Sequence, residues 1–184
     1  MSVVDSKKVK IITLPVSRWH EYKDIRLRAL EKEPSSFCMA YDKEVAKSDK
    51  DWKQSIQDAL DGNSWLYFAS YNDKLVGVIG GFGDELDWKN HRVYLWGMYV
   101  DEEYRGKGLA RLLANKLLFA IANRDDVFVV RLEVNPELVT ALSFYESLGF
   151  RRMGVETHVF CDGLLREVLI MEKVVHPIVL KDNS

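Results

Sequence analysis

The chain has 184 residues, the length of one ordinary folded domain with a hydrophobic core of its own. Hydrophobic residues make up 47% and charged residues 29%, a composition typical of soluble globular proteins. The formal net charge of −2 gives no overall basic field of the kind that attracts nucleic acid. We therefore expect a single domain over residues 1–184, with its core at about 8–175, and no nucleic-acid partner.

The cysteine pattern and the hydropathy bear on the compartment. Cys38 and Cys161 form no metal-binding or redox motif, and their separation favours free thiols in a reducing compartment, although one disulfide remains an alternative. The N-terminal region carries lysines but no apolar run of signal-peptide length, and no stretch reaches the ~20 apolar residues of a membrane span. These features predict a cytoplasmic protein without a membrane partner.

The first part of the chain predicts one short strand and two helices. Val9 to Leu14 is a β-branched strand candidate, and apolar residues at helical spacing favour a helix from Ser17, its predicted cap, to about Lys32. Pro34 ends that helix, and residues 35–47 have the composition of a loop with some helical character. A second helix is expected to begin at Ser48 or Asp49 and to end near Gly62.

An antiparallel meander follows. Trp65 to Tyr71 and Leu75 to Phe82 are predicted strands joined by Asn72-Asp73, a two-residue hairpin signal. After a polar loop, His91 to Val100 is the third strand. Gly97 lies inside it and predicts a bulge or a close approach of another backbone, since glycine weakens a regular strand.

The last part alternates helices and strands. Gly106 to Asn123 is the strongest helix, and Val127 to Val134 is a nearly continuous apolar run expected in a central strand. Asn135-Pro136-Glu137 has the composition of a helix start, and Gly149 ends that helix. The chain finishes with predicted strands Arg151 to Phe160 and Leu165 to Val174, joined by a turn at Asp162-Gly163. The whole pattern is mixed α/β.

The turn Arg105-Gly106-Lys107-Gly108 lies between a strand and a helix. Its glycines allow close backbone approach to an anion, the first helical turn offers N–H donors, and Arg105, Lys107 and Arg111 add positive charge. The segment therefore favours a phosphate-bearing ligand, with a solvated basic loop as the alternative. It is not a Walker A loop, because no Gly-Lys-Ser/Thr ends it, and it lacks the third glycine of the dinucleotide fingerprint.

Tyr145 and the histidines are further candidates for functional residues, and each can also have a purely structural role. Tyr145 lies on a helix face beside Leu142 and Leu148, where an aromatic side chain is usually part of the core, and its functional role requires the phenol to reach a cleft. The four histidines are scattered without metal-ligand spacing, so no metal site is predicted.

Two segments in order resemble the GNAT N-acetyltransferase superfamily. Leu95-Trp-Gly-Met-Tyr-Val100 followed by Arg105-Gly-Lys-Gly-Leu-Ala110 resembles the fourth strand and the acetyl-CoA motif of that family. Ala141-x-x-Phe144-Tyr145-x-x-x-Gly149-Phe150 resembles its later helix. The resemblance covers nearly the whole chain. It implies a central, largely antiparallel, splayed sheet of about six to seven strands flanked by about four helices.

The resemblance also implies a cosubstrate, acetyl-CoA, and a set of contacts. The turn from Arg105 to Ala110 would hold the pyrophosphate, and the backbone of Met98 to Val100 would pair with the pantetheine arm. Tyr145 would lie beside the sulfur and act as the catalytic acid. The implied cofactor-binding residues are Met98, Tyr99, Val100, Arg105, Gly106, Lys107, Gly108, Leu109, Ala110, Ser143 and Tyr145.

Two positions depart from the family pattern. The fourth strand has no acidic residue in Leu95-Trp96-Gly97, and Leu138 stands where an asparagine is usual. The general base is therefore unassigned. Its candidates are Glu133, Asp84, Glu85 and Asp87, although the simpler interpretation of each is a solvated surface acid.

The expected function is direct acetyl transfer from acetyl-CoA to a primary amine of a small molecule, peptide or protein. A non-catalytic acyl-CoA-binding or regulatory domain is the alternative, because the acid at Trp96 is missing. A phosphate-binding module for another nucleotide is a third. The acceptor stays open among polyamines, aminoglycosides, amino acids, protein lysines and protein N-termini, and so does a homodimer formed through the final strands.

Overall fold

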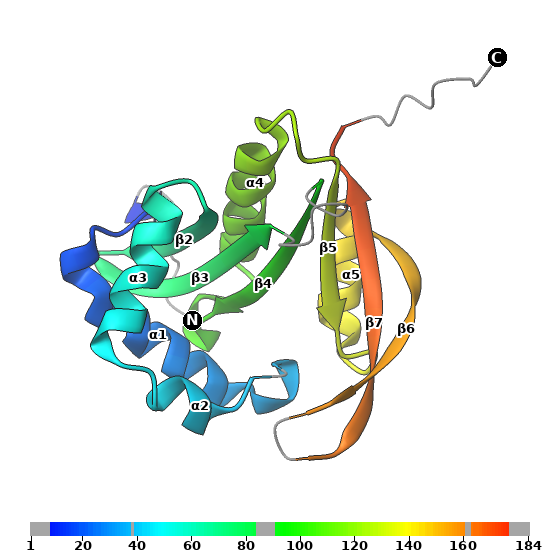
Figure 1. Ribbon diagram of the computed structural model, residues 1–184, viewed down its shortest axis with the longest axis horizontal. Helices are drawn as coiled ribbons and strands as arrows, with labels where there is room; N and C mark the ends of the chain where they lie inside the picture. Colours follow the sequence, from blue (N-terminus) through cyan, green and yellow to red (C-terminus); the bar gives the residue numbers. More distant parts are fainter. Residues whose placement is uncertain (1–7, 38, 84–90, 161–162, 177–184) are drawn as a thin grey trace.

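The structure, a computed structural model, describes residues 8–37, 39–83, 91–160 and 163–176. Its sheet has seven strands in the order β1-β2-β3-β4-β5-β7-β6 (Figure 1). Neighbouring strands are antiparallel except β4 and β5, which are parallel. The strands are β1 (Val9–Ile12), β2 (Ser64–Tyr71), β3 (Lys74–Gly83), β4 (Arg92–Val100), β5 (Val129–Val134), β6 (Arg151–Val159) and β7 (Leu165–Val174).

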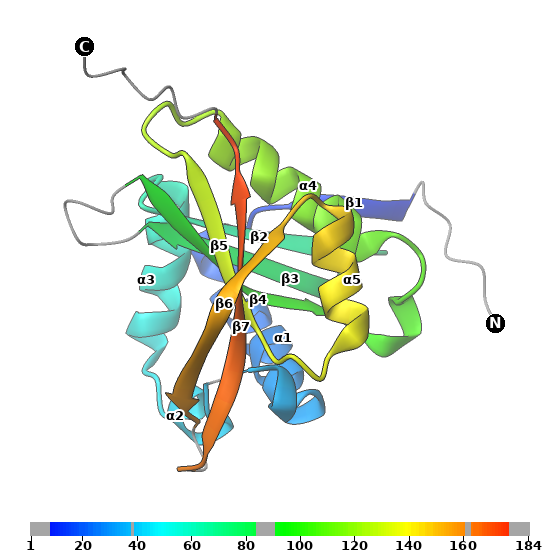
Figure 2. The same cartoon turned by 90° about the vertical axis from the view of Figure 1, so that its right-hand side faces the viewer.

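In the described part of the chain, five α-helices cover the two faces of this sheet. Helices α1 and α3 pack on one face of β2 to β4, and α4 packs on the other, with α5 behind β5 and β7 (Figures 1 and 2). The mixed α/β class and the splayed, largely antiparallel sheet agree with the expectation, which had about one helix fewer. The helices are α1 (Trp19–Lys32), α2 (Tyr41–Val45), α3 (Asp49–Leu60), α4 (Leu109–Ala122) and α5 (Val139–Ser147), with short 3-10 turns at Val16–Arg18, Pro34–Ser36 and Glu102–Tyr104.

Several local predictions are confirmed. Asn72 and Asp73 both have positive φ, 49° and 62°, which is the geometry of a type I′ hairpin turn between β2 and β3. Ser48 caps α3 in a complete capping box, because its hydroxyl accepts from the Asp51 N–H while the Asp51 carboxylate accepts from the Ser48 N–H. These elements depend on neighbouring residues only, which is why the sequence predicts them.

Three predicted helix starts are wrong. Ser17 does not cap α1, because it lies inside the 3-10 turn Val16–Arg18 and the helix begins after it. Helix α4 begins at Leu109 rather than Gly106, since positive φ at Gly106 and Gly108 keeps the preceding residues out of the right-handed helix.

The start of α5 also differs from the expectation. The Asn135 side chain accepts from the Glu137 N–H (2.9 Å), and the Asn135 carbonyl accepts from the Leu138 N–H (3.0 Å). These bonds close a turn of the kind that asparagine favours, so the helix begins only at Val139. An asparagine that caps a helix and an asparagine that closes an Asx turn occur in similar sequences, so the sequence alone does not distinguish them.

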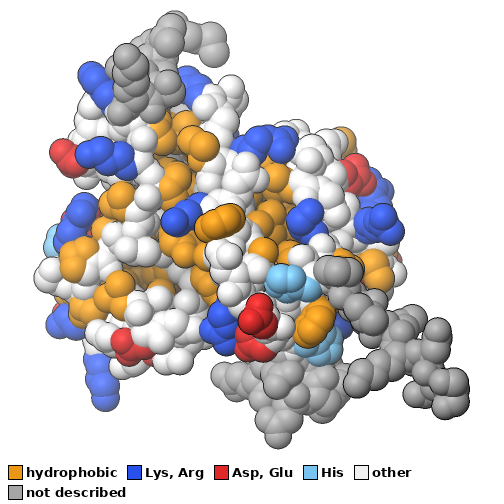
Figure 3. All heavy atoms as spheres, turned by 90° about the horizontal axis from the view of Figure 1, so that it is seen from above, with side chains coloured by type: hydrophobic (Ala, Val, Ile, Leu, Met, Phe, Trp, Pro, Cys, Tyr) orange, Lys and Arg blue, Asp and Glu red, His pale blue; other side chains and the backbone are white. Residues whose placement is uncertain are grey.

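The core has two main layers, one on each side of the sheet. One face buries β-branched and leucine side chains of the strands against α4 and α5, and the other buries larger aromatic side chains against α1 and α3. Trp52 and Phe68 are fully buried in that second layer. Over the end of the molecule seen in Figure 3, side chains of both charge signs are interspersed with hydrophobic ones.

Candidate active site

A cavity of about 770 Å³ lies where strands β4 and β5 separate. The two strands pair through Arg92–Tyr94 and Val129–Arg131 and diverge beyond these residues (Figure 1). The cavity is therefore bounded by the second half of β4, the glycine turn, the start of α4, the end of β5 and α5. Most of the predicted cofactor residues line it, namely Met98, Tyr99, Val100, Arg105, Gly106, Gly108, Leu109, Ala110 and Tyr145.

Lys107 and Ser143, the other two predicted cofactor residues, are exposed and do not line this cavity. Of the candidate bases, Glu133 lines it. Asp84, Glu85 and Asp87 lie outside the described residues.

The glycine turn has the backbone geometry that its sequence requires. Gly106 and Gly108 have φ values of +70° and +82°, a region that side-chain-bearing residues rarely adopt. Gly108 is the N-cap of α4, and a Cβ added at either glycine would have no described atom within 4 Å. The helix N-terminus is thus approachable at a point where its N–H groups and its dipole favour an anion.

Arg105 fixes this turn to the rest of the protein. Its guanidinium donates from Nε to the carbonyl oxygen of Val100 (2.8 Å) and from Nη2 to Oε1 of Glu33 (2.7 Å). Glu33, the C-cap residue of α1, lines the same cavity. The side chain of Arg105 therefore positions the turn in this structure, while the glycine backbone faces the cavity.

The other two cations of the segment also have protein partners. Lys107 donates to the Glu103 carbonyl oxygen (2.6 Å), and Arg111 donates to the Ser147 hydroxyl (2.7 Å) on α5. Arg111 lines the cavity and joins its two helical walls. Three cations, Arg105, Lys107 and Arg111, therefore lie in and beside the glycine turn, each with a protein partner.

The predicted bulge at Gly97 is confirmed. Tyr99 is paired with Val78 and Trp96 with Gly80, so β4 has one more residue than β3 between these two pairs. Gly97 has φ of +67°, and it lines the cavity. A bulge leaves backbone groups outside the regular ladder, which makes them accessible to a ligand in the cavity.

Tyr145 is both a core residue and a cavity residue. Its ring makes edge contacts with Phe144 and Phe150, with centroid distances of 5.3 and 5.7 Å, and the residue is 8% exposed. It also lines the cavity, at the side of α5. Burial raises the pKa of the Tyr145 phenol well above its ordinary value, so the phenol keeps its proton at neutral pH.

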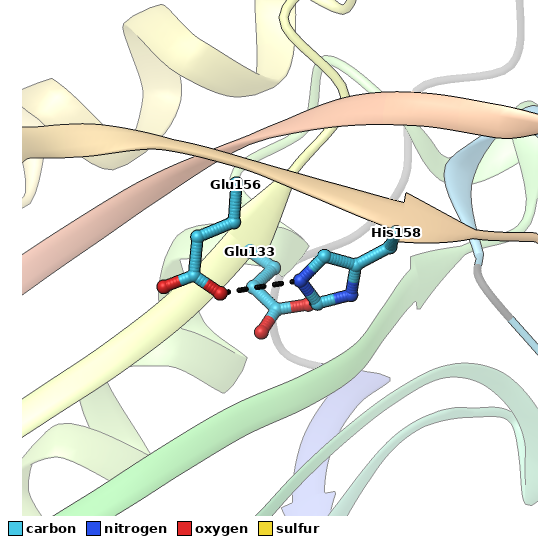
Figure 4. Close-up of side chains that lie close together, drawn as sticks. All are labelled: Glu133, Glu156 and His158. Atoms are coloured by element: carbon cyan, nitrogen blue, oxygen red, sulfur yellow. Dashed lines mark hydrogen bonds and ion pairs between the residues drawn. The ribbon is translucent and has the colours of Figure 1, made fainter.

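Glu133, Glu156 and His158 form a cluster beside the cavity (Figure 4). His158 Nδ1 lies 3.7 Å from Oε2 of Glu133, and His158 Nε2 lies 3.3 Å from Oε2 of Glu156. Glu133 comes from β5 and the other two from β6. His158 has no role predicted from the sequence. The alternation of side chains along a strand predicts that residues 156 and 158 lie on one face of β6. Their proximity to Glu133 on β5 depends on the order of the strands, which the sequence does not show.

Two aromatic side chains of the cavity wall were not predicted. Phe37 and Trp96 line the cavity, and the Trp96 ring lies so close to Gly80 that a Cβ there would overlap it. Gly80 therefore makes room for Trp96 on the neighbouring strand. The positions of Phe37 and Trp96 in the cavity wall cannot be predicted from one sequence, because the residues that they contact are far away in the chain.

No helix in the described part of the chain is long and apolar enough to cross a membrane.

Comparison with known proteins places the chain in a family. The model of the acetyltransferase (GNAT) family matches residues 19–150. The N-acetylaspartate synthetase of Xenopus tropicalis is 36% identical over 107 residues, which are 58% of this chain and 38% of that protein. N-acetyltransferase 8B of Homo sapiens is 30% identical over 92 residues, or 50% of this chain and 40% of that protein. The matched region thus spans about two fifths of the length of these curated relatives.

Solved structures show the same fold. The acetyltransferase of the GNAT family from Streptococcus pneumoniae has a TM-score of 0.81 at 16% identity, covering 91% of this chain and 99% of that one. A protein from Salmonella typhimurium, solved with its cofactor acetyl-CoA, has a TM-score of 0.78 at 15% identity, covering 96% and 99%. The chain therefore belongs to the GNAT family of acetyltransferases.

Proposed function

We propose that this protein is an acetyl-CoA-dependent N-acetyltransferase that moves the acetyl group directly to a primary amine. The observation that carries this proposal is the cavity of about 770 Å³, in which the glycine turn, the bulged strand and Tyr145 meet. Membership of the family and the acetyl-CoA bound to the Salmonella typhimurium protein support the choice of cosubstrate.

The cavity has suitable groups for the pyrophosphate and the pantetheine arm of acetyl-CoA. The backbone from Arg105 to Ala110, at the N-terminus of α4, would bind the pyrophosphate. The diverging segment Met98 to Val100 would pair with the pantetheine arm as an added strand does with a sheet edge. Lys107 and Ser143 are exposed on the protein surface, so their contacts with acetyl-CoA stay a prediction.

The reaction needs two proton transfers and one stabilised oxyanion. A neutral amine attacks the thioester carbonyl, the new C–N bond forms, and the C–S bond breaks. A backbone N–H at the Gly97 bulge would stabilise the oxyanion, and Tyr145 would give its proton to the leaving thiolate. Holding both reactants in one cavity supplies much of the rate enhancement.

Glu133 is the best-placed base among the described candidates. It lines the cavity on β5, opposite the β4 positions that lack an acid, and its carboxylate is accessible to an incoming ammonium group. It would take the proton that the amine loses. This placement also favours an enzyme over the non-catalytic acyl-CoA-binding alternative, since Glu133 would stand in for the acid that β4 lacks.

The proposal is tested by calorimetric titration with acetyl-CoA, free coenzyme A, ATP and NAD, followed by an amine panel monitored for thiol release. Selective binding of coenzyme A with amine-dependent thiol release supports the enzyme. Coenzyme A binding without thiol release for any amine supports the regulatory domain. Tighter binding of ATP or NAD supports a nucleotide-binding module.

Two further expectations remain proposals. We infer a cytoplasmic location from the two cysteines, Cys38 and Cys161, whose separation in the sequence favours free thiols. A homodimer through the final strands is supported by the exposure of β6, where Met153 and Val155 are 58% and 54% exposed at the edge of the sheet. Sedimentation of the purified chain would test the second expectation.

A further inference from the structure

A buried cation lies directly behind one wall of the cavity. Arg26, on α1, is 5% exposed. Its guanidinium carbon lies 5.1 Å from the centroid of the Phe37 ring and 5.3 Å from that of the Trp96 ring. Both rings line the cavity. Aromatic faces stabilise a guanidinium but accept none of its in-plane hydrogen bonds, so its N–H groups need other partners.

Two of the three guanidinium nitrogens lack a hydrogen-bond partner in the described part of the chain. Arg26 Nε and Nη1 are buried and donate no hydrogen bond. The carboxylate of Glu44 is 3.8 Å from Nε, too far for a hydrogen bond, and its other oxygen accepts from Lys47 at 2.8 Å. One carboxylate thus faces two cations. Because a buried unpaired donor is costly, a second anion at Arg26 would stabilise the cluster.

The guanidinium faces the bulge of β4. A Cβ built on Gly97 would lie 3.6 Å from Arg26 Nη1, with no other described atom within 4 Å apart from its chain neighbours. No side chain therefore separates the guanidinium from the backbone at the bulge. Gly97 also lines the cavity, and in the function proposed above the bulge holds the thioester carbonyl. Arg26 itself is not among the residues that line the cavity. An anion of the acceptor would reach it at the position that the missing Gly97 side chain leaves open, close to the attacking amine.

We propose that Arg26 binds a carboxylate of the acceptor, and that the acceptor is a free amino acid. This inference rests on the proposed N-acetyltransferase function. In a free α-amino acid the amine and the carboxylate share one carbon atom, so both reach the bulge together. A polyamine or an internal protein lysine has no carboxylate beside its amine, and a protein N-terminus has a neutral amide there.

The opposite wall complements this arrangement. Glu133, on β5, lines the cavity and offers a carboxylate to the ammonium group of the acceptor. Arg26 lies behind the β4 wall, next to Trp96 and Gly97. A zwitterion is the ligand class that satisfies a carboxylate on one strand and a guanidinium behind the other.

The first test varies the acceptor and leaves the protein unchanged. The full chain, saturated with coenzyme A, is titrated calorimetrically with free L-amino acids and with their α-carboxamides. Thiol release from acetyl-CoA is then measured for the same pairs. We expect at least one free acid to bind and react about 10- to 100-fold better than its amide, the range of one charge-assisted hydrogen bond. The amine of an α-carboxamide is less basic than that of the free acid, so a larger fraction of it is neutral and able to attack. A preference for the free acid would therefore be opposite to the order of intrinsic reactivity.

The second test removes the charge pair. The double variant Arg26→Gln/Glu44→Gln deletes both charges, so that no unpaired buried carboxylate is left to unfold the protein. Its matched control is Arg18→Gln/Glu21→Gln, another arginine–glutamate pair, which lies at the start of α1. We expect the preference for the free acid to vanish in the first double variant, with coenzyme A affinity and thermal midpoint retained, and to persist in the second.

Amides that bind and react as well as the acids would overturn the carboxylate proposal while leaving the acetyltransferase in place. Failure of every free acid to bind the coenzyme A complex would overturn it too. A carboxylate preference in binding, lost in Arg26→Gln/Glu44→Gln, would support it even without thiol release, and in that case only the proposed catalytic function would fail.

Discussion

The guanidinium of Arg105 donates a hydrogen bond to the carboxylate of Glu33 across 2.7 Å, although the two residues are 72 positions apart in the chain. This contact joins the end of α1 to the glycine turn, and it puts a negative charge beside the proposed pyrophosphate site. Glu33 therefore competes with a phosphate for the same cation.

We expect Glu33→Gln to tighten coenzyme A binding by about two- to fivefold, since it removes the negative charge of a partly exposed ion pair. The effect should shrink at high salt. Calorimetric titration at two ionic strengths measures it. Glu31→Gln, an exposed glutamate on the same helix, is the control and should leave affinity unchanged. Weaker binding in Glu33→Gln would mean that the ion pair is needed to hold the turn.

Gly108→Glu should lower coenzyme A affinity about 100-fold or more. The substitution puts a side chain at φ +82° and an acid at the N-terminus of α4, where an anion is expected to bind. Gly62→Glu is the matched control, because Gly62 also has positive φ and open space around it but lies away from the cavity. Equal affinity of the two variants would count against the phosphate site.

Tyr145→Phe should reduce kcat about 100-fold while coenzyme A affinity changes little, because the ring contacts with Phe144 and Phe150 remain and only the proton donor is lost. Steady-state kinetics and calorimetry separate the two quantities. Tyr67→Phe, also a tyrosine whose pKa burial raises, serves as the control. Unchanged turnover in Tyr145→Phe would leave Tyr145 as a packing residue only.

Glu133→Gln should also lower kcat/KM, by about 100-fold, if this carboxylate takes the proton from the acceptor amine. Glu156→Gln removes the neighbouring acid, which contacts His158 but does not line the cavity, and should change the rate by less than about threefold. Rates over a range of pH with one good acceptor compare the two variants. Equal effects would assign the cluster a general electrostatic role rather than a base.

Tyr99 predicts a loss of stability at alkaline pH. Burial is the main cause that raises the pKa of the Tyr99 phenol to about 12, and the charge of Asp101 is the second. A tyrosine in the unfolded chain has a pKa of about 10. The contribution of Tyr99 to the free energy of unfolding is therefore fully present below pH ~10, and it is lost as the pH rises through ~12. The thermal midpoint of the wild type should therefore fall more steeply above pH ~10 than that of Tyr99→Phe. Tyr41→Phe, at a residue that is 43% exposed, is the control and should follow the wild type.

Much of the fold is predictable because the signals are local. The hairpin at Asn72-Asp73 and the cap at Ser48 depend on a few adjacent residues, and the bulge at Gly97 depends on glycine inside a strand. The predicted starts of α4 and α5 fail for an equally local reason. Glycine with positive φ and an asparagine turn compete with helix initiation, and composition does not separate the two outcomes.

The site is predictable only in part. The glycine turn and Tyr145 carry motifs, so they can be found in one sequence. Arg26 reaches the cavity wall through its contacts with Phe37 and Trp96, and Trp96 fits there because Gly80 lies beneath it. Such contacts between distant segments depend on strand order and side-chain packing, which local patterns do not determine.

Strands β4 and β5 pair through three residues on each strand, Arg92–Tyr94 and Val129–Arg131. Among the described residues, this short ladder joins the β1 to β4 part of the sheet to the β5 to β7 part. Local opening there breaks few hydrogen bonds, so amide hydrogen exchange should be fast along the far ends of both strands in the free protein. A ligand that spans the gap would bond to both parts, and exchange should slow in β4 and β5 together.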